Sequence, residues 1–128
     1  MRLMLLALIA LAAAGQQRNG VLIITDAEGV AGICRQEQVE QGNQELQRLL
    51  TGEINAAVNG FLKAGATEVV VWDGHGGSYT LTALTIHDRA RLITGSLGPK
   101  MLMDTGRFAA VAFLGQHARA NRERAIMA

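Results

Sequence analysis

The chain has 128 residues, with 12 Lys and Arg, 11 Asp and Glu, and a formal net charge of +1. This length fits a single domain, and a chain so nearly neutral, with no long basic run, offers no electrostatic footprint for nucleic acid. Its one cysteine, Cys34, excludes an internal disulfide framework.

The first fifteen residues have the pattern of an export signal. Arg2 gives a short positive region, residues 3–11 are apolar, and the small residues 12–15 follow, as a signal peptidase requires. Nine apolar residues are too few to span a hydrocarbon core, which needs roughly 20. We therefore expect residues 1–15 to be a cleaved signal peptide and the protein to be periplasmic or secreted, free of the membrane after cleavage. An uncleaved membrane anchor is the alternative.

Four apolar runs have the pattern of buried strands. They are residues 20–25, 68–72, 109–114 and, more weakly, 90–93. Between the first two runs, apolar residues recur every four positions from Leu46 to Leu62, which predicts an amphipathic helix that ends at Gly65. A shorter helix is expected over residues 99–104, with Pro99 in its first turn. A strand, a helix and a strand in this order make a parallel crossover, so we predict an α/β fold with a mainly parallel sheet flanked by helices.

Two features of the predicted elements are unusual. Gly52 and Gly60 lie inside the long helix, where each costs about 1 kcal/mol relative to alanine, and they predict close packing or a kink near residue 52. At the other end of the chain, residues 115–128 follow a buried strand without a clear stop, and one major helix is a thin cover for a four-stranded sheet. We expect the fold to be incomplete at the C-terminus, with residues 20–128 forming the N-terminal portion of a larger α/β domain.

Polar residues follow three of the predicted strands. Asp26 and Glu28 come after the first, Asp73 and His75 after the second, and His117 after the last. The carboxyl ends of parallel strands share one edge of a sheet, where ligands bind. Carboxylate oxygens and imidazole nitrogens are ligands of zinc and related divalent cations. The sequence therefore predicts a metal site formed by Asp26, Glu28, His75 and His117.

Several alternatives accompany this prediction. Asp73 could be a further ligand, but we favour a hydrogen bond that it accepts from His75 and that orients the ring. Any one of these residues alone is more often a turn former, a helix cap or an ordinary loop residue. The glycine-rich residues 74–78 could cradle a phosphate in a nucleotide-binding domain, although they lack the Gly-x-Gly-x-x-Gly spacing. We interpret Cys34 as an inert thiol.

Seven segments, in order along the chain, match the pattern of a known family. They are residues 26–32, 51–57, 64–66, 69–71, 73–76, 90–96 and 113–118, which include Asp-Ala-Glu-Gly, Asp-Gly-His-Gly and Gly-Gln-His-Ala. Together they resemble the N-terminal part of the D-aminopeptidase family of dinuclear zinc metallopeptidases. The resemblance runs through essentially the whole chain after the signal peptide and covers about the first half of the family's length.

The resemblance implies a function and a role for each site residue. Asp26 would bridge two zinc ions, Glu28 and His75 would complete one zinc, and His117 would bind the other. The family's remaining Glu ligand and presumed catalytic His fall at or beyond Ala128, so no catalytic residue is assigned within the chain. The implied enzyme is an aminopeptidase that removes N-terminal residues, D-amino acids among them, from short peptides, and that assembles as a homo-oligomer when intact. A non-catalytic metal- or peptide-binding module of the cell envelope is the alternative.

Overall fold

The computed structural model describes residues 19–95, 98–104, 106–119 and 123, so the predicted signal peptide lies outside the described residues. The sheet has four strands, in the order β3-β2-β1-β4, and every neighbouring pair is parallel. The strands are β1 (Gly20–Thr25), β2 (Glu68–Trp72), β3 (Ala90–Ile93) and β4 (Phe108–Leu114). The predicted parallel α/β fold is confirmed, and β4 begins one residue earlier than predicted.

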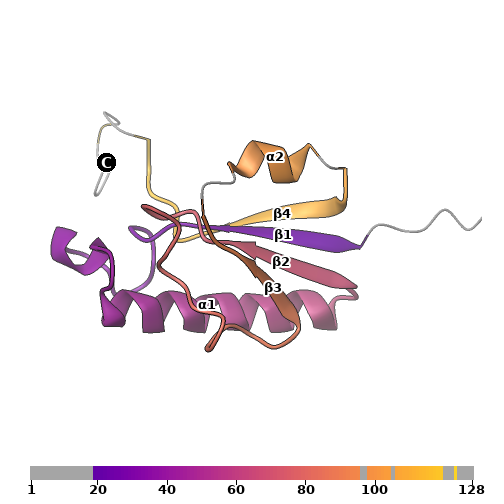
Figure 1. Cartoon of the computed structure of the whole chain (residues 1–128), viewed down its shortest axis with the longest axis horizontal. Helices are drawn as coiled ribbons and strands as arrows, with labels where there is room; N and C mark the ends of the chain where they lie inside the picture. Colours follow the sequence, from indigo (N-terminus) through magenta and orange to yellow (C-terminus); the bar gives the residue numbers. More distant parts are fainter. Residues whose placement is uncertain (1–18, 96–97, 105, 120–122, 124–128) are drawn as a thin grey trace, which may run out of the picture.

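Helices lie on both faces of the sheet (Figure 1). The long helix α1 (Gln44–Lys63) runs along one face, and the short helix α2 (Pro99–Met103) lies on the other. A 3-10 helix, η1 (Gln36–Val39), precedes α1. The first turn of α1 is capped by Asn43, whose side chain accepts a hydrogen bond from the backbone N–H of Leu46. The chain leaves α1 at Gly65, whose φ of 96° suits glycine, as the sequence predicts.

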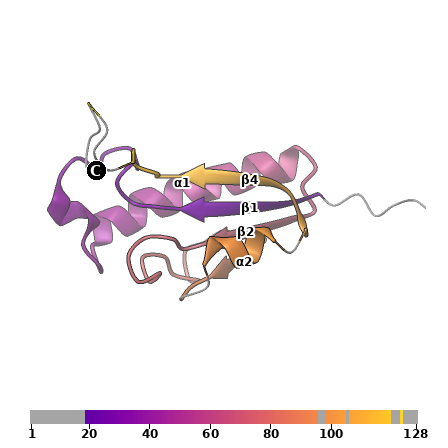
Figure 2. The same ribbon diagram turned by 90° about the horizontal axis from the view of Figure 1, so that it is seen from above.

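Alternate residues of the central strands pack into two apolar layers. Val21 and Ile23 of β1 face α1 and belong to the larger cluster, to which the helix contributes the buried residues Leu46, Leu50, Ile54 and Val58. Leu22 and Ile24 face the other way and pack with Leu102 of α2. Figure 2, seen from above, shows α2 over the half of the sheet that contains β2. Burial on both faces explains why β1 is continuously apolar.

The glycines of α1 do not act as predicted. The helix continues without interruption from Gln44 to Lys63, and a Cβ atom built on Gly52 or Gly60 would meet nothing within 4 Å. Both residues lie on the exposed side of the helix, where neither close packing nor a kink is needed. The prediction of close packing or a kink near residue 52 is therefore wrong.

Among the described residues, no helix has the length and apolar character needed to cross a membrane.

Candidate metal centre

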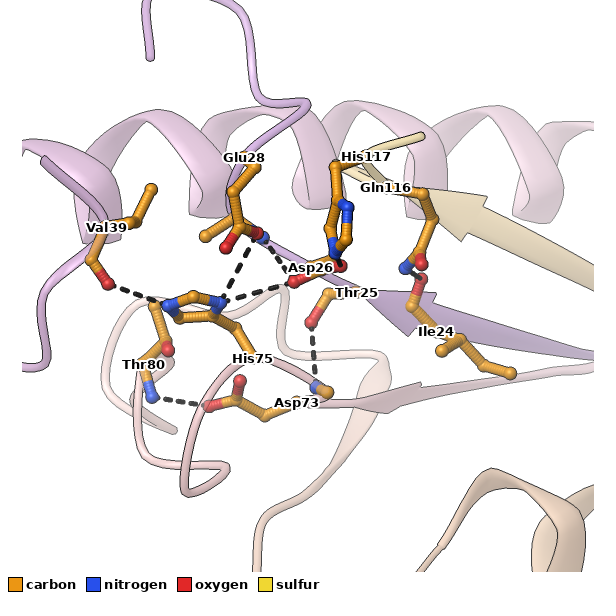
Figure 3. Close-up of polar contacts among 12 residues, drawn as sticks. Ile24, Thr25, Asp26, Glu28, Val39, Asp73, His75, Thr80, Gln116 and His117 are labelled. Carbon is orange, nitrogen blue, oxygen red and sulfur yellow. Dashed lines mark hydrogen bonds and ion pairs between the residues drawn. The ribbon is translucent and has the colours of Figure 1, made fainter. Parts of the chain in front are cut away.

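Three loops meet at the carboxyl edge of the sheet, where β1, β2 and β4 end (Figure 3). The loop after β1 is tied to β4, because the Asp26 N–H donates to the Leu114 carbonyl at 2.8 Å. The loop after β2 is tied to β1, because the Gly74 N–H donates to the Thr25 hydroxyl at 3.3 Å. These bonds between neighbouring chain segments hold the three loops in a fixed relation to one another.

Asp26 lies between two histidines that come from two different loops (Figure 3). Its Oδ1 atom is 3.2 Å from Nδ1 of His75, and its Oδ2 atom is 3.6 Å from Nε2 of His117. Oδ1 also accepts a hydrogen bond from the backbone N–H of Ala27 at 2.9 Å, which restrains the rotamer of the carboxylate. The two oxygens of one carboxylate thus face two separate imidazoles.

Glu28 adds a second carboxylate to the same cluster. Its Oε2 atom is 3.6 Å from Nδ1 of His75, yet it is buried and has no hydrogen-bond partner among the described residues. A buried carboxylate oxygen without a hydrogen bond is costly unless a further positive group satisfies it. One ligand atom each from Asp26, Glu28 and His75 lies within 4.8 Å of the others. Two oxygens and one nitrogen in this arrangement fit a divalent cation such as zinc.

The charges in the cluster shift the pKa values of its members. The hydrogen bond with Asp26 raises the pKa of His75 to about 8, against the opposing effect of burial, and the Val39 carbonyl and Glu28 add to the rise. Burial works to raise the pKa of Asp26, but hydrogen bonds with His75 and the Ala27 N–H outweigh it and lower that pKa below its usual value. The Asp26 carboxylate is therefore negative at neutral pH and attracts a positive charge. A bound cation would take the place of the His75 proton, since only a neutral ring nitrogen ligates a metal.

In each histidine of the cluster, the ring nitrogen that does not face Asp26 lies within hydrogen-bond distance of a backbone carbonyl oxygen. Nε2 of His75 is 2.7 Å from the Val39 oxygen, and Nδ1 of His117 is 2.6 Å from the Ala118 oxygen. These bonds fix the ring orientations, as is usual for metal-ligating histidines. His117 is the more open of the two, with 37% of its side chain exposed against 14% for His75.

Asp73 takes a different role from the predicted one. It is fully buried, and its Oδ2 atom accepts hydrogen bonds from the backbone N–H groups of Thr80 and Leu81 at 2.7 and 2.8 Å. In the part of the chain that the structure describes, no hydrogen bond joins Asp73 to His75, so the predicted orienting bond is not formed. Asp73 instead closes the loop that carries His75 by binding the backbone on its far side.

Glycines allow the loops of the site to approach one another closely. A Cβ atom on Gly74 would lie 2.3 Å from the Thr25 carbonyl oxygen, and one on Gly115 would lie 2.1 Å from the Asp26 carbonyl oxygen. Gly115 also has a φ of 71°, which other residues rarely adopt. At both positions the missing side chain leaves room for the neighbouring backbone.

The structure places the four predicted ligands close together. Two groups that support them, the Val39 carbonyl and the Thr25 hydroxyl, are not predicted from the sequence. The Val39 carbonyl carries no signal in the sequence, because every residue has a carbonyl and only its position matters. The Thr25 hydroxyl, which donates to the Trp72 carbonyl at 3.2 Å and accepts from Gly74, is hidden in an apolar strand. Its position as the last residue before Asp26 is the one signal that points to it.

Comparisons with known proteins agree with the family resemblance. The family model Peptidase_M55, described as D-aminopeptidase, matches residues 20–128. A D-aminopeptidase of Bacillus subtilis (strain 168) is 32% identical over 101 residues, which cover 75% of this chain and 37% of the relative. The structure of the Zn-dependent D-aminopeptidase DppA from Bacillus subtilis, described as a self-compartmentalizing protease, matches with a TM-score of 0.69 and 31% identity. That match covers 80% of this chain and 39% of DppA, so the chain spans about two fifths of the length of these relatives.

Proposed function

This chain belongs to the D-aminopeptidase family, and from that premise we propose that it forms the N-terminal part of a zinc-dependent aminopeptidase. The proposed reaction is hydrolysis of the first peptide bond of a short peptide, with D-amino acids among the residues released. The observation that carries the proposal is the position of Asp26, whose two oxygens face His75 and His117 from two different loops. A carboxylate with an imidazole beside each of its oxygens could supply donors to two zinc ions held close together.

The residues of the cluster divide naturally between two cations. Asp26, Glu28 and His75 would supply donors for one zinc, and the buried Oε2 atom of Glu28, which has no hydrogen bond among the described residues, supports this assignment. His117, with Asp26, supplies donors for the other. Zinc bound in such a site supplies Lewis acidity to a scissile carbonyl and to water.

Other groups of the chain hold these donors in place. Backbone carbonyls orient both imidazoles, and the Ala27 N–H restrains Asp26. The glycine contacts keep the three loops at one edge of the sheet. Because His117 is more exposed than His75, the half of the site around His117 is the better approach for a peptide.

Location and assembly are further parts of the proposal. The pattern of residues 1–15 supports export, so the protein would be periplasmic or secreted. The relative DppA is described as a self-compartmentalizing protease, which supports a homo-oligomer for the intact protein. The proposed substrate is a short peptide, which would reach the site inside the assembly.

Zinc content and peptidase activity together test the proposal. The intact wild-type protein should bind zinc in stoichiometric amounts, measured by mass spectrometry of the metal after dialysis. Its hydrolysis of D-Ala and L-Ala peptides should stop on chelation. Asp26→Asn and His75→Ala should both lower the zinc content. The matched controls are Asp88→Asn, whose side chain is 89% exposed, and His87→Ala, which lies outside the cluster.

Two results would count against parts of the proposal. Unchanged zinc content in both Asp26→Asn and His75→Ala would reject the metal site. Stoichiometric zinc at the cluster without hydrolysis of any peptide by the intact protein would instead favour a non-catalytic binding module.

A further inference from the structure

The short helix η1 contacts the site although none of its residues is a predicted ligand. The carbonyl oxygen of Val39, its last residue, lies 2.7 Å from Nε2 of His75 (Figure 3). A carbonyl can only accept a hydrogen bond, so Nε2 must carry a hydrogen and donate it. When the ring is neutral, its other nitrogen, Nδ1, is then left without a hydrogen.

Nδ1 is also the nitrogen that faces the carboxylates. It lies 3.2 Å from Asp26 Oδ1 and 3.6 Å from Glu28 Oε2. The Val39 carbonyl thus selects the ring nitrogen that the rest of the cluster needs. Without that carbonyl, the hydrogen of the neutral ring would be free to move to Nδ1, where it would block a cation.

The position of the Val39 carbonyl depends on Gln38. Gln38 is only 5% exposed, and the Oε1 atom of its side chain accepts hydrogen bonds from the N–H groups of Cys34 and Arg35 at 2.9 and 3.1 Å. Its Nε2 atom donates to the Gly32 carbonyl at 3.2 Å and to Glu45 Oε2 at 3.1 Å. Four hydrogen bonds connect η1 to the preceding loop and to α1, so the peptide that follows Gln38 has little freedom to move.

The side chain of Val39 provides a second anchor. It is buried in the apolar cluster between α1 and the sheet. On the basis of the metal site proposed above, we infer that Gln38 is a positioning residue for the metal centre. It holds the Val39 carbonyl so that His75 is kept in the tautomer with hydrogen on Nε2 and offers Nδ1 to the cation.

The tautomer can be measured directly by nuclear magnetic resonance. Protein labelled with 15N-histidine and loaded with zinc should show His75 with its hydrogen on Nε2 and without one on Nδ1, in long-range 1H–15N spectra. The His75 signals are assigned by their loss in His75→Ala. A hydrogen on Nδ1 with zinc at Nε2 would overturn the inference.

Substitution of Gln38 tests the positioning role. Gln38→Ala should weaken zinc binding about tenfold or more, as measured by titration calorimetry, because supporting hydrogen bonds of this kind are worth that much affinity. It should also populate the other His75 tautomer. The matched control is Gln36→Ala, an exposed glutamine on the same short helix, which should change affinity by less than about twofold.

A double variant separates positioning from general damage to the loop. Gln38→Glu alone places two carboxylates together at Glu45 and should weaken zinc binding. Gln38→Glu with Glu45→Gln keeps the acceptor for the Cys34 and Arg35 N–H groups and exchanges donor and acceptor in the side-chain pair, but it does not restore the bond to the Gly32 carbonyl. It should therefore recover part of the affinity that Gln38→Glu loses. Circular dichroism confirms that each variant is folded. Equal zinc affinity and an unchanged tautomer in folded Gln38→Ala would overturn the inference.

A metal-free measurement keeps this inference distinct from the proposed function. In metal-free protein at a pH well above the usual histidine range, the single hydrogen of the His75 ring should still be on Nε2, where the Val39 carbonyl lies 2.7 Å away and accepts it. If wild-type protein binds no zinc but shows this tautomer, the proposed metal site fails while the orientation by Val39 stands. If zinc binds but the hydrogen is on Nδ1, the metal site stands and the role of Gln38 is refuted.

Discussion

The buried carboxylate of Asp73 offers the sharpest test of how the loop before the site is held. One of its oxygens accepts hydrogen bonds from the backbone N–H groups of Thr80 and Leu81, and all three residues are buried. Asp73→Ala removes the acceptor and leaves two N–H groups in the interior without a partner. The loop between these residues carries His75, so the substitution should also loosen the position of His75 without removing any candidate ligand.

The magnitude follows from the two lost bonds. An unsatisfied buried N–H group costs about 1–3 kcal/mol, so Asp73→Ala should lower the free energy of unfolding by about 2–6 kcal/mol. This is a large part of the total stability of a domain of this size, which is about 5–15 kcal/mol. Asp73→Asn should cost less, because its amide oxygen still accepts both bonds but loses the assistance of the negative charge.

Urea unfolding followed by circular dichroism measures these differences. With a slope of about 2 kcal/mol/M, Asp73→Ala should lower the unfolding midpoint by at least about 1 M. Asp88→Ala, at an aspartate whose side chain is 89% exposed, serves as the control and should change the free energy of unfolding by less than about 0.5 kcal/mol. Equal midpoints for Asp73→Ala and Asp88→Ala would refute the assigned role of the two backbone bonds.

Two further predictions concern a glycine contact and an ion pair. Gly115→Ala should destabilise the protein and lower its zinc content, because Gly115 has a φ of 71° and the new Cβ would lie 2.1 Å from the Asp26 carbonyl oxygen. Gly52→Ala, on the open side of α1, is the control and should instead stabilise the protein by up to about 1 kcal/mol in thermal unfolding. The hydrogen bond with Arg107 lowers the pKa of Glu68, so this carboxylate stabilises the fold above its unfolded pKa, and that contribution is lost as the pH falls through the lower folded pKa. Below a pH of about 4, unfolding curves should therefore show a smaller further loss of stability for Glu68→Gln than for wild type, and parallel pH profiles of the two proteins would contradict this assignment.

The elements of the fold could be predicted because their signals are local. Continuous apolar runs mark strands buried on both faces, and the four-residue spacing from Leu46 to Leu62 marks the helix that covers one of those faces. The order of strands β3-β2-β1-β4 could not be predicted in the same way. It depends on which strands pair, and the apolar pattern of each strand allows several neighbours.

The helical glycines show where a local signal misleads. Gly52 and Gly60 cost stability wherever they lie in a helix, so the sequence suggests a structural reason for them. The structure places both on the exposed side of α1 with open space around them. Local propensity can identify such a cost, but only the packing around the residue shows whether anything offsets it.

The candidate site also has features that the sequence determines and features that depend on the tertiary structure. The sequence alone determined which donors lie at the carboxyl edge of the sheet, because a parallel strand fixes where its next residues emerge, and Asp26, Glu28, His75 and His117 all follow strand ends. Only the tertiary structure decided that Asp73 binds backbone N–H groups and that a carbonyl from η1 reaches His75. Such bonds join segments far apart in the chain through backbone atoms that every residue has, so they depend on positions in space and leave no mark in the order of side chains.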